Sequence, residues 1–148
     1  MPRDIDWVAL RAMQPRFGAT YEANHTIFRQ GELGSEFYII LDGEVGMFIR
    51  RPDGKEERVA VLGRGTFFGE MGVFRAEKRS ASARTMSPTS VLFFSTKTVT
   101  DLLVSSPKFA LGIIQTLCDR ISDDDEEIVR LHQELEACRQ GHLERRLA

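Results

Sequence analysis

The spacing of hydrophobic positions changes twice along the chain. In Ile5–Met13 they fall on one face of a short helix, with Asp4 as its expected cap and Pro15 just past its end. In Ala19–Phe94 they alternate with polar or small residues in short runs. After Ser95 the helical spacing returns. This pattern predicts a β-rich middle segment between helical ends.

The middle segment contains several short runs that are rich in β-branched and aromatic residues. Turn signals such as Asp42-Gly43 and Pro52-Asp53-Gly54 separate these runs. Such a succession of short strands predicts an antiparallel roll or sandwich. The expected strands are Thr26–Arg29, Glu36–Leu41, Glu44–Arg50, Arg58–Leu62, Ala81–Thr85 and Ser90–Ser95.

Two helices are expected after the strands. The first covers Lys97–Val104, and Ser106 followed by Pro107 then provides the cap and first position of a second helix. This second helix is predicted to continue to Gln140, with Gly141 as its end.

The last helix carries a second pattern, a strict 4-3-4-3 spacing typical of a coiled-coil seam. We expect this seam to form a homodimer, and the alternative is that the stripe packs on the strands of its own chain. Asp123, Asp124 and Asp125 would repel each other across a two-fold axis. The seam positions are Leu117, Ile121, Asp124, Ile128, Leu131, Leu135, Cys138, His142 and Arg145.

The composition is that of an ordinary globular protein. Of 148 residues, 42% are hydrophobic and 28% are charged, and the formal net charge is −2. This balance provides no general attraction to nucleic acid or to anionic membranes. No apolar run is long enough to span a bilayer and the N-terminus lacks a signal-peptide core, so we expect a cytoplasmic protein.

Side chains that could build a metal centre or a catalytic site are scattered. Cys118 and Cys138 lack metal-ligand spacing, and the three histidines are equally dispersed. The sequence shows no nucleophile–histidine–acid motif and no Walker-type loop. We therefore expect no metal, no cofactor and no enzymatic activity.

One stretch, Phe67–Thr85, has the composition of an anion site. A helix that begins at Gly69 offers free backbone N–H groups and the positive end of its dipole. Arg79, nine residues after Glu70, adds a forked and permanently charged donor. A phosphate would repel a neighbouring carboxylate, so Glu70 is expected to accept a hydrogen bond from a sugar hydroxyl of the ligand. The stretch therefore predicts a sugar phosphate as ligand.

The segment Ile27–Arg120 resembles a cyclic nucleotide-binding domain. This module occurs in bacterial catabolite-activator-type regulators, protein kinase A regulatory subunits and cyclic-nucleotide-gated channels. The resemblance implies a jelly-roll (double-stranded β-helix) fold with a cassette helix, over residues 1–115, and a long C-terminal helix over residues 116–148. The matching motifs are Phe28-Arg29-Gln30-Gly31-Glu32, Phe37-Tyr38-Ile39-Ile40, Gly43-Glu44-Val45, Leu62-Gly63-Arg64-Gly65, Phe68-Gly69-Glu70-Met71 and Arg79-Ser80-Ala81.

The resemblance also implies a role for each residue of the cassette. Arg79 would pair with the exocyclic phosphate oxygens, and Glu70 would accept from the ribose 2′-hydroxyl. Backbone N–H groups near Gly69 and Met71 would face the ligand, and Ser80, which Ala81 follows at the end of the cassette, would donate to the phosphate. The structural alternatives are a surface salt bridge for Arg79 and a helix-terminus charge interaction for Glu70.

Recognition of the base is expected from the last helix. Ile121 and Ile128 are the candidate lid residues, and Asp124 and Asp125, with their neighbour Asp123, are the candidate base contacts. A carboxylate can accept two hydrogen bonds from guanine but one from adenine. Cyclic AMP is the first expectation because the family uses it broadly, and a cGMP-selective sensor is the alternative.

The expected function is a sensor that passes its signal to an unknown downstream protein. Activator-type relatives continue from the long helix into a winged helix-turn-helix, whereas this sequence stops at Ala148. We therefore expect no DNA binding by this chain and no membrane partner. A degenerate fold that acts only in interaction or dimerisation is the other alternative.

Overall fold

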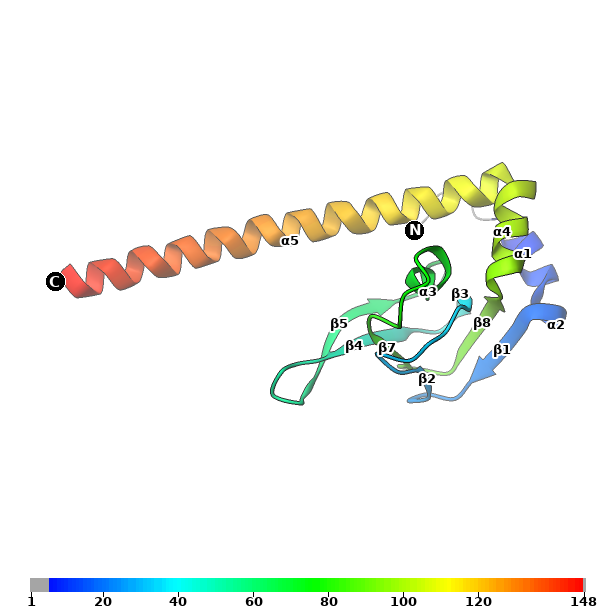
Figure 1. Cartoon of the computed structure of the whole chain (residues 1–148), viewed down its shortest axis with the longest axis horizontal. Coiled ribbons are helices and arrows are strands. Elements are labelled where there is room, and N and C mark those ends of the chain that lie inside the picture. Colours follow the sequence, from blue (N-terminus) through cyan, green and yellow to red (C-terminus); the bar gives the residue numbers. More distant parts are fainter. Residues whose placement is uncertain (1–5, 148) are drawn as a thin grey trace. The chain divides into compact units, whose positions relative to one another are not determined.

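The computed structural model describes residues 6–147, which contain thirteen helices and strands (Figure 1). The chain divides into two compact units, Met1–Gly112 and Ile113–Ala148. The first unit holds all the strands, and the second consists of the greater part of one long helix. Within the described residues, no helix is both long and apolar enough to cross a membrane.

The strands of the first unit form two antiparallel four-stranded sheets. Their orders are β1-β8-β3-β6 and β2-β7-β4-β5, which is the strand order of a jelly roll. The predicted fold class is therefore confirmed. The strands are β1 (Gly18–Tyr21), β2 (Thr26–Phe28), β3 (Phe37–Asp42), β4 (Val45–Arg50), β5 (Glu56–Leu62), β6 (Phe67–Phe68), β7 (Ser82–Thr85) and β8 (Thr89–Phe94).

Two of these strands, β1 and β6, are absent from the list expected from sequence. Strand β6 has only two residues, and it pairs with β3 through Tyr38 opposite Phe68 and Ile39 opposite Phe67. Strand β1 has four residues and pairs with β8. Strand β6 is too short to show an alternation, and pairing with β3 and β8 defines these two strands.

The predicted N-terminal helix is present, but its capping residue differs from the predicted one. Helix α1 (Trp7–Ala12) begins after Asp6, whose side-chain oxygen accepts a hydrogen bond from the Ala9 N–H at 3.0 Å. The expected cap, Asp4, lies outside the described residues. Pro15 lies just past the end of α1, as predicted, and in the first turn of α2 (Gln14–Phe17), where its missing N–H costs nothing.

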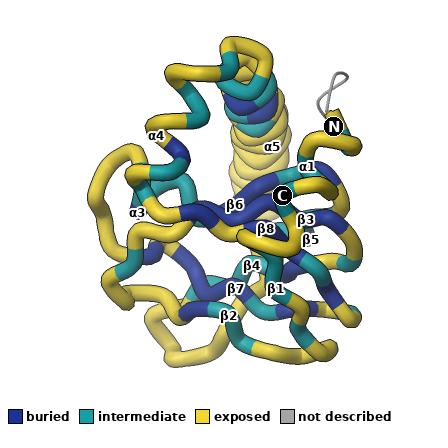
Figure 2. Tube along the Cα trace, turned by 90° about the vertical axis from the view of Figure 1, so that its right-hand side faces the viewer, coloured by how far each residue is buried: buried dark blue, intermediate teal, exposed yellow. Residues whose placement is uncertain are grey.

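Aromatic rings fill the interior of the roll. Tyr38 and Phe68 stack with ring centroids 4.8 Å apart, and Phe28 lies 5.9 Å from Tyr38 and 5.8 Å from Phe68. The buried residues follow the strands, and the connecting loops are largely exposed (Figure 2). These three rings come from β2, β3 and β6, so they join the two sheets at one end of the core.

The cap predicted for the long C-terminal helix is confirmed, and the helix before it also begins with a serine cap. Ser95 caps α4 (Thr96–Ser105) by accepting from the Thr98 N–H, and Ser106 accepts from the Phe109 N–H at 3.2 Å at the start of α5 (Pro107–Leu147). The predicted end at Gly141 is wrong, because α5 continues to Leu147. One glycine costs a helix only about 1 kcal/mol, which the flanking glutamate, arginine and leucine residues offset.

The seam predicted on the last helix is solvent-exposed in the single chain. Ile121, Ile128, Leu131 and Leu135 expose 61%, 63%, 50% and 52% of their surface. They lie in the second unit, where regular 3.6-residue geometry brings them to one side of α5. This helix therefore presents an apolar stripe that its own unit does not cover.

Burial of Tyr38 makes the fold sensitive to alkali. Burial is the main cause that raises the pKa of Tyr38 from 10.0 to about 12. The phenol thus stays neutral in the folded chain at pH values where it already ionises in the unfolded chain. Its contribution to the free energy of unfolding is intact below pH 10 and is lost as the pH rises toward 12. Replacing Tyr38→Phe is expected to reduce that loss, measured by urea unfolding at several pH values followed by circular dichroism. An equally steep decline in the variant would contradict this explanation.

Candidate functional site

Gly69 turns the chain from β6 into the short helix α3 (Glu70–Phe74). Its φ angle is +84°, in the left-handed region that glycine alone adopts readily. A side chain here would also have no room, since a Cβ atom would lie 2.6 Å from the Glu36 carbonyl oxygen. The start of α3 is therefore held directly against the segment that precedes β3.

Two more glycines allow three segments to pack closely at this point. Gly72 is buried in α3, and a Cβ atom on it would overlap the Gly34 carbonyl oxygen. A Cβ atom on Gly34 would in turn lie 2.7 Å from both Nε and Nη2 of Arg79. The loop before β3, helix α3 and the Arg79 side chain thus approach one another without intervening side-chain atoms.

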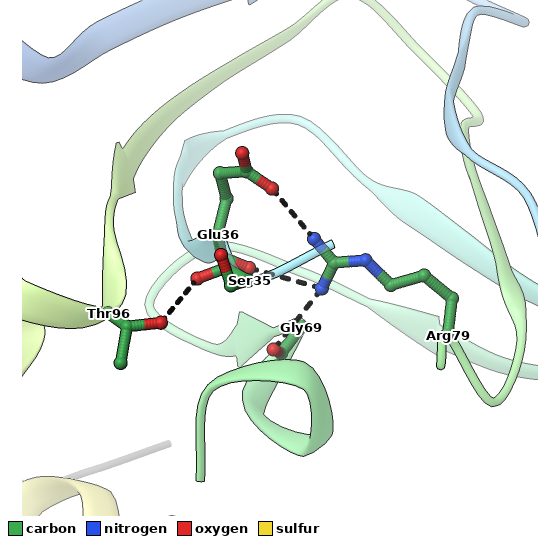
Figure 3. A network of polar contacts seen from close by, with 5 residues as sticks. All are labelled: Ser35, Glu36, Gly69, Arg79 and Thr96. Atoms are coloured by element: carbon green, nitrogen blue, oxygen red, sulfur yellow. Dashed lines mark hydrogen bonds and ion pairs between the residues drawn. The ribbon is translucent and has the colours of Figure 1, made fainter. Parts of the chain in front are cut away.

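Arg79 lies just before β7, and its side chain is almost completely buried, with 3% of its surface exposed. Nη1 donates to the carbonyl oxygens of Glu36 at 3.2 Å and Gly69 at 3.3 Å, and Nη2 donates to the Glu36 carboxylate at 3.1 Å (Figure 3). The guanidinium carbon also lies 4.2 Å from the centre of the Phe28 ring. A permanent positive charge is therefore fixed at the edge of the aromatic core.

Backbone hydrogen bonds fix the position from which this side chain extends. The Arg79 N–H donates to the Glu32 carbonyl at 2.9 Å, and the Arg79 carbonyl accepts from the Gly31 N–H at 2.8 Å. This pairing sets the cassette beside the loop that contains the Gly31-Glu32 motif. The sequence alternative of a surface salt bridge does not describe Arg79, because the charge that pairs with Glu36 is buried.

The other predicted cassette residues flank the same point. Glu70 and Met71 occupy the first two positions of α3 and are partly buried. Ser80 is exposed and Ala81 is buried, directly after Arg79. The contact between Arg79 and the Gly69 carbonyl brings the two halves of the cassette together in the folded chain.

The predicted lid and base-contact residues lie in the second unit. Ile121, Asp124, Asp125 and Ile128 are all on α5 and are all solvent-exposed. Their proposed contacts with a ligand stay a prediction.

A pocket of about 240 Å³ opens beside the guanidinium. Its wall combines aromatic rings with acidic side chains and the buried cation, a mixture that suits a small polar ligand with an apolar part. Burial raises the pKa of Tyr21 as well as that of Tyr38, so both hydroxyls stay protonated to a higher pH than a free tyrosine. Among the lining residues are Tyr21, Phe28, Glu36, Tyr38, Arg79 and Phe93.

Sequence reasoning missed Gly34 and Glu36 as residues of this site. Gly34 lies in a loop between two expected strands, and Glu36, the first residue of the expected strand 36–41, is 43 positions from Arg79. A single glutamate at a strand start carries no local signal of a contact over that distance. The described residues also contain no group of three or more histidine, cysteine or acidic side chains that could hold a metal ion.

Comparison with known proteins agrees with the motifs. A family model described as the cyclic nucleotide-binding domain matches residues 19–106. The chain is similar to the cyclic AMP receptor protein of Thermus thermophilus, with 32% identity over 127 residues that cover 86% of this chain and 57% of that protein. It is also similar to a CRP-like cAMP-activated global transcriptional regulator of Mycobacterium tuberculosis, with 28% identity over 101 residues that cover 68% of this chain and 45% of that protein.

The same similarity appears in three dimensions. The crystal structure of the Thermus thermophilus catabolite activator protein superposes with a TM-score of 0.72 at 29% identity, covering 87% of this chain and 60% of that one. The chain thus spans about half the length of the curated relatives it matches. The family resemblance predicted from the motifs is confirmed.

The glycine packing predicts a sharp difference between two alanine substitutions. Gly72→Ala forces a methyl group onto the Gly34 carbonyl, so it is expected to lower the free energy of unfolding by about 1–3 kcal/mol. Gly63→Ala is the matched control, because a Cβ atom there meets nothing within 4 Å, and it is expected to change stability by less than about 1 kcal/mol. Urea unfolding of both variants measures the difference. Equal stabilities would show that the contact between α3 and Gly34 does not constrain the fold.

Proposed function

The chain belongs to the cyclic nucleotide-binding domain family, and we propose that it is a non-catalytic sensor that binds a cyclic nucleotide, with cAMP as first choice. The observation that carries this proposal is the buried Arg79 guanidinium, held beside Gly69 where α3 begins. A cyclic phosphate is an anion whose oxygens such a forked guanidinium donor can bind.

The proposed roles of the cassette residues are those that the family resemblance implies. Arg79 receives the phosphate, which it binds more strongly in this water-poor setting than it would at the surface. Ser80 is exposed directly after it and can add a hydroxyl and a backbone N–H. Glu70, at the first position of α3, accepts from the ribose 2′-hydroxyl, with Gly69 and Met71 as its backbone neighbours. Ala81, buried after Ser80, closes the cassette.

Two relatives that respond to cAMP support the preference for this nucleotide. The Thermus protein is a cyclic AMP receptor, and the Mycobacterium regulator is cAMP-activated. A cGMP-selective sensor is the alternative, because Asp124 or Asp125 could accept from both the N1–H and the amino group of guanine. Side-by-side affinities for the two nucleotides decide between them.

We propose that α5 carries the signal. Ile121 or Ile128 would cover the base when ligand is bound, and the exposed stripe would pair with a second copy of the chain. The dimer would act on a downstream protein, without membrane or direct DNA contact by this chain. If neither nucleotide binds, the exposed stripe favours the second candidate, a pure interaction module.

Removal of Arg79 is the direct test of the site. Arg79→Ala is expected to weaken cAMP binding at least about 100-fold, which corresponds to about 2.7 kcal/mol, because the buried phosphate contact is lost. Titration calorimetry with cAMP and cGMP measures the change in affinity. Arg79→Lys keeps the positive charge but removes the forked guanidinium donor, and circular dichroism checks that the variants are folded.

Arg75→Ala is the control for that experiment. Its side chain is 64% exposed and pairs with Glu77, so binding is expected to stay unchanged. Wild-type affinity in both Arg79 variants would show that the ligand site lies elsewhere. Absence of wild-type binding at millimolar nucleotide would support the interaction module instead.

The proposed dimer predicts a specific disulfide. Cys138 lies on the seam, where a parallel two-fold pairing places it against its own copy, whereas Cys118 lies off the seam, and both are exposed free thiols. Mild oxidation is expected to give a covalent dimer that Cys138→Ser abolishes and Cys118→Ser preserves, seen on non-reducing gels. A monomer mass in sedimentation, or cross-linking through Cys118 instead, contradicts the proposed seam.

A further inference from the structure

The positive charge of Arg79 already has a counterion within the chain. The Glu36 carboxylate accepts from Nη2 at 3.1 Å, which places a negative charge where the proposed phosphate would be bound (Figure 3). The ion pair is one-sided, because the Arg79 side chain is 3% exposed and that of Glu36 is 48% exposed. Moving the Arg79 side chain into water would disturb the core, whereas the Glu36 side chain can turn into water without doing so.

The backbone around Glu36 is held independently of its carboxylate. The Glu36 carbonyl accepts from Nη1 of Arg79 at 3.2 Å, and the preceding Ser35 carbonyl accepts from the Thr96 hydroxyl of α4 at 3.1 Å. Within residues 6–147, the polar contact of the carboxylate itself is with Nη2 of Arg79. The Glu36 side chain can therefore rotate outward while the segment before β3 stays in place.

The guanidinium also keeps its orientation when Glu36 leaves. Nη1 is bound by two carbonyl oxygens, those of Glu36 and Gly69, and the Phe28 ring lies against the guanidinium. An exchange of anions would thus change the partner of Nη2 and leave the other contacts intact. A cyclic phosphodiester carries a single negative charge, the same as the carboxylate, so the charge balance of the site is conserved.

We propose that Glu36 is an affinity-setting residue that competes with the nucleotide phosphate for Arg79. In the free protein it neutralises the buried guanidinium, and ligand binds by displacing the carboxylate into solvent. The fold thereby avoids an unpaired buried charge, and nucleotide affinity is lowered by the strength of the internal ion pair. This inference rests on the proposed function, because it concerns the same anion site.

The test compares two isosteric substitutions by titration calorimetry with cAMP. Glu36→Gln removes the competing charge and is expected to bind about five- to tenfold more tightly than wild type. Glu77→Gln is the matched control, because the Glu77 side chain is 44% exposed, close to the value for Glu36, and its carboxylate pairs with Arg75 rather than with Arg79. It is expected to bind like wild type, which excludes a general effect of removing one negative charge near an anion site.

The outcomes separate this inference from the proposed function. Unchanged or weaker binding by Glu36→Gln, with wild type binding normally, overturns the competition and leaves the nucleotide site standing. Equal tightening by both variants also overturns it, because the effect is then general electrostatics. Failure of wild type, Glu36→Gln and Glu36→Ala to bind, with thermal melts showing that all are folded, rejects the nucleotide site itself.

Discussion

Burial of one guanidinium is the constraint around which this site is built. A charged side chain withdrawn from water is tolerated only with a counterion and well-placed hydrogen bonds. Arg79 has both, through the carboxylate and carbonyl of Glu36 and the carbonyl of Gly69. The glycines at 34, 69 and 72 follow from this requirement, since side chains there would separate the backbone segments that surround the cation.

The jelly roll supplies the partners of that cation. Glu36 precedes β3, Gly69 follows β6, and these two strands are hydrogen-bonded neighbours in one sheet. Arg79 enters from the loop before β7, which belongs to the other sheet. The Phe28, Tyr38 and Phe68 rings pack between the sheets, and the Phe28 ring lies against the guanidinium. The site is thus formed where both sheets meet, and it depends on the packing of the core.

The two units of the chain carry different parts of the proposed mechanism. The roll holds the proposed anion site, whereas α5 carries the exposed apolar stripe and the three consecutive aspartates. A ligand can shift the behaviour of α5 only as far as it binds one arrangement of the helix better than another.

Local signals in the sequence were sufficient to predict much of the fold and the position of the cassette. Alternation identified six strands, Ser106 and Pro107 identified the start of α5, and Gly69-Glu70 with Arg79 identified the cassette, because each depends on neighbouring residues. The two-residue strand β6, the passage of α5 through Gly141 and the ion pair with Glu36 needed the tertiary structure. Short strands and buried charges depend on partners that are distant in sequence, and a local sequence pattern does not identify those partners. The sequence by itself thus determined the family and the position of the cassette, and the tertiary structure decided which carboxylate already pairs with its arginine.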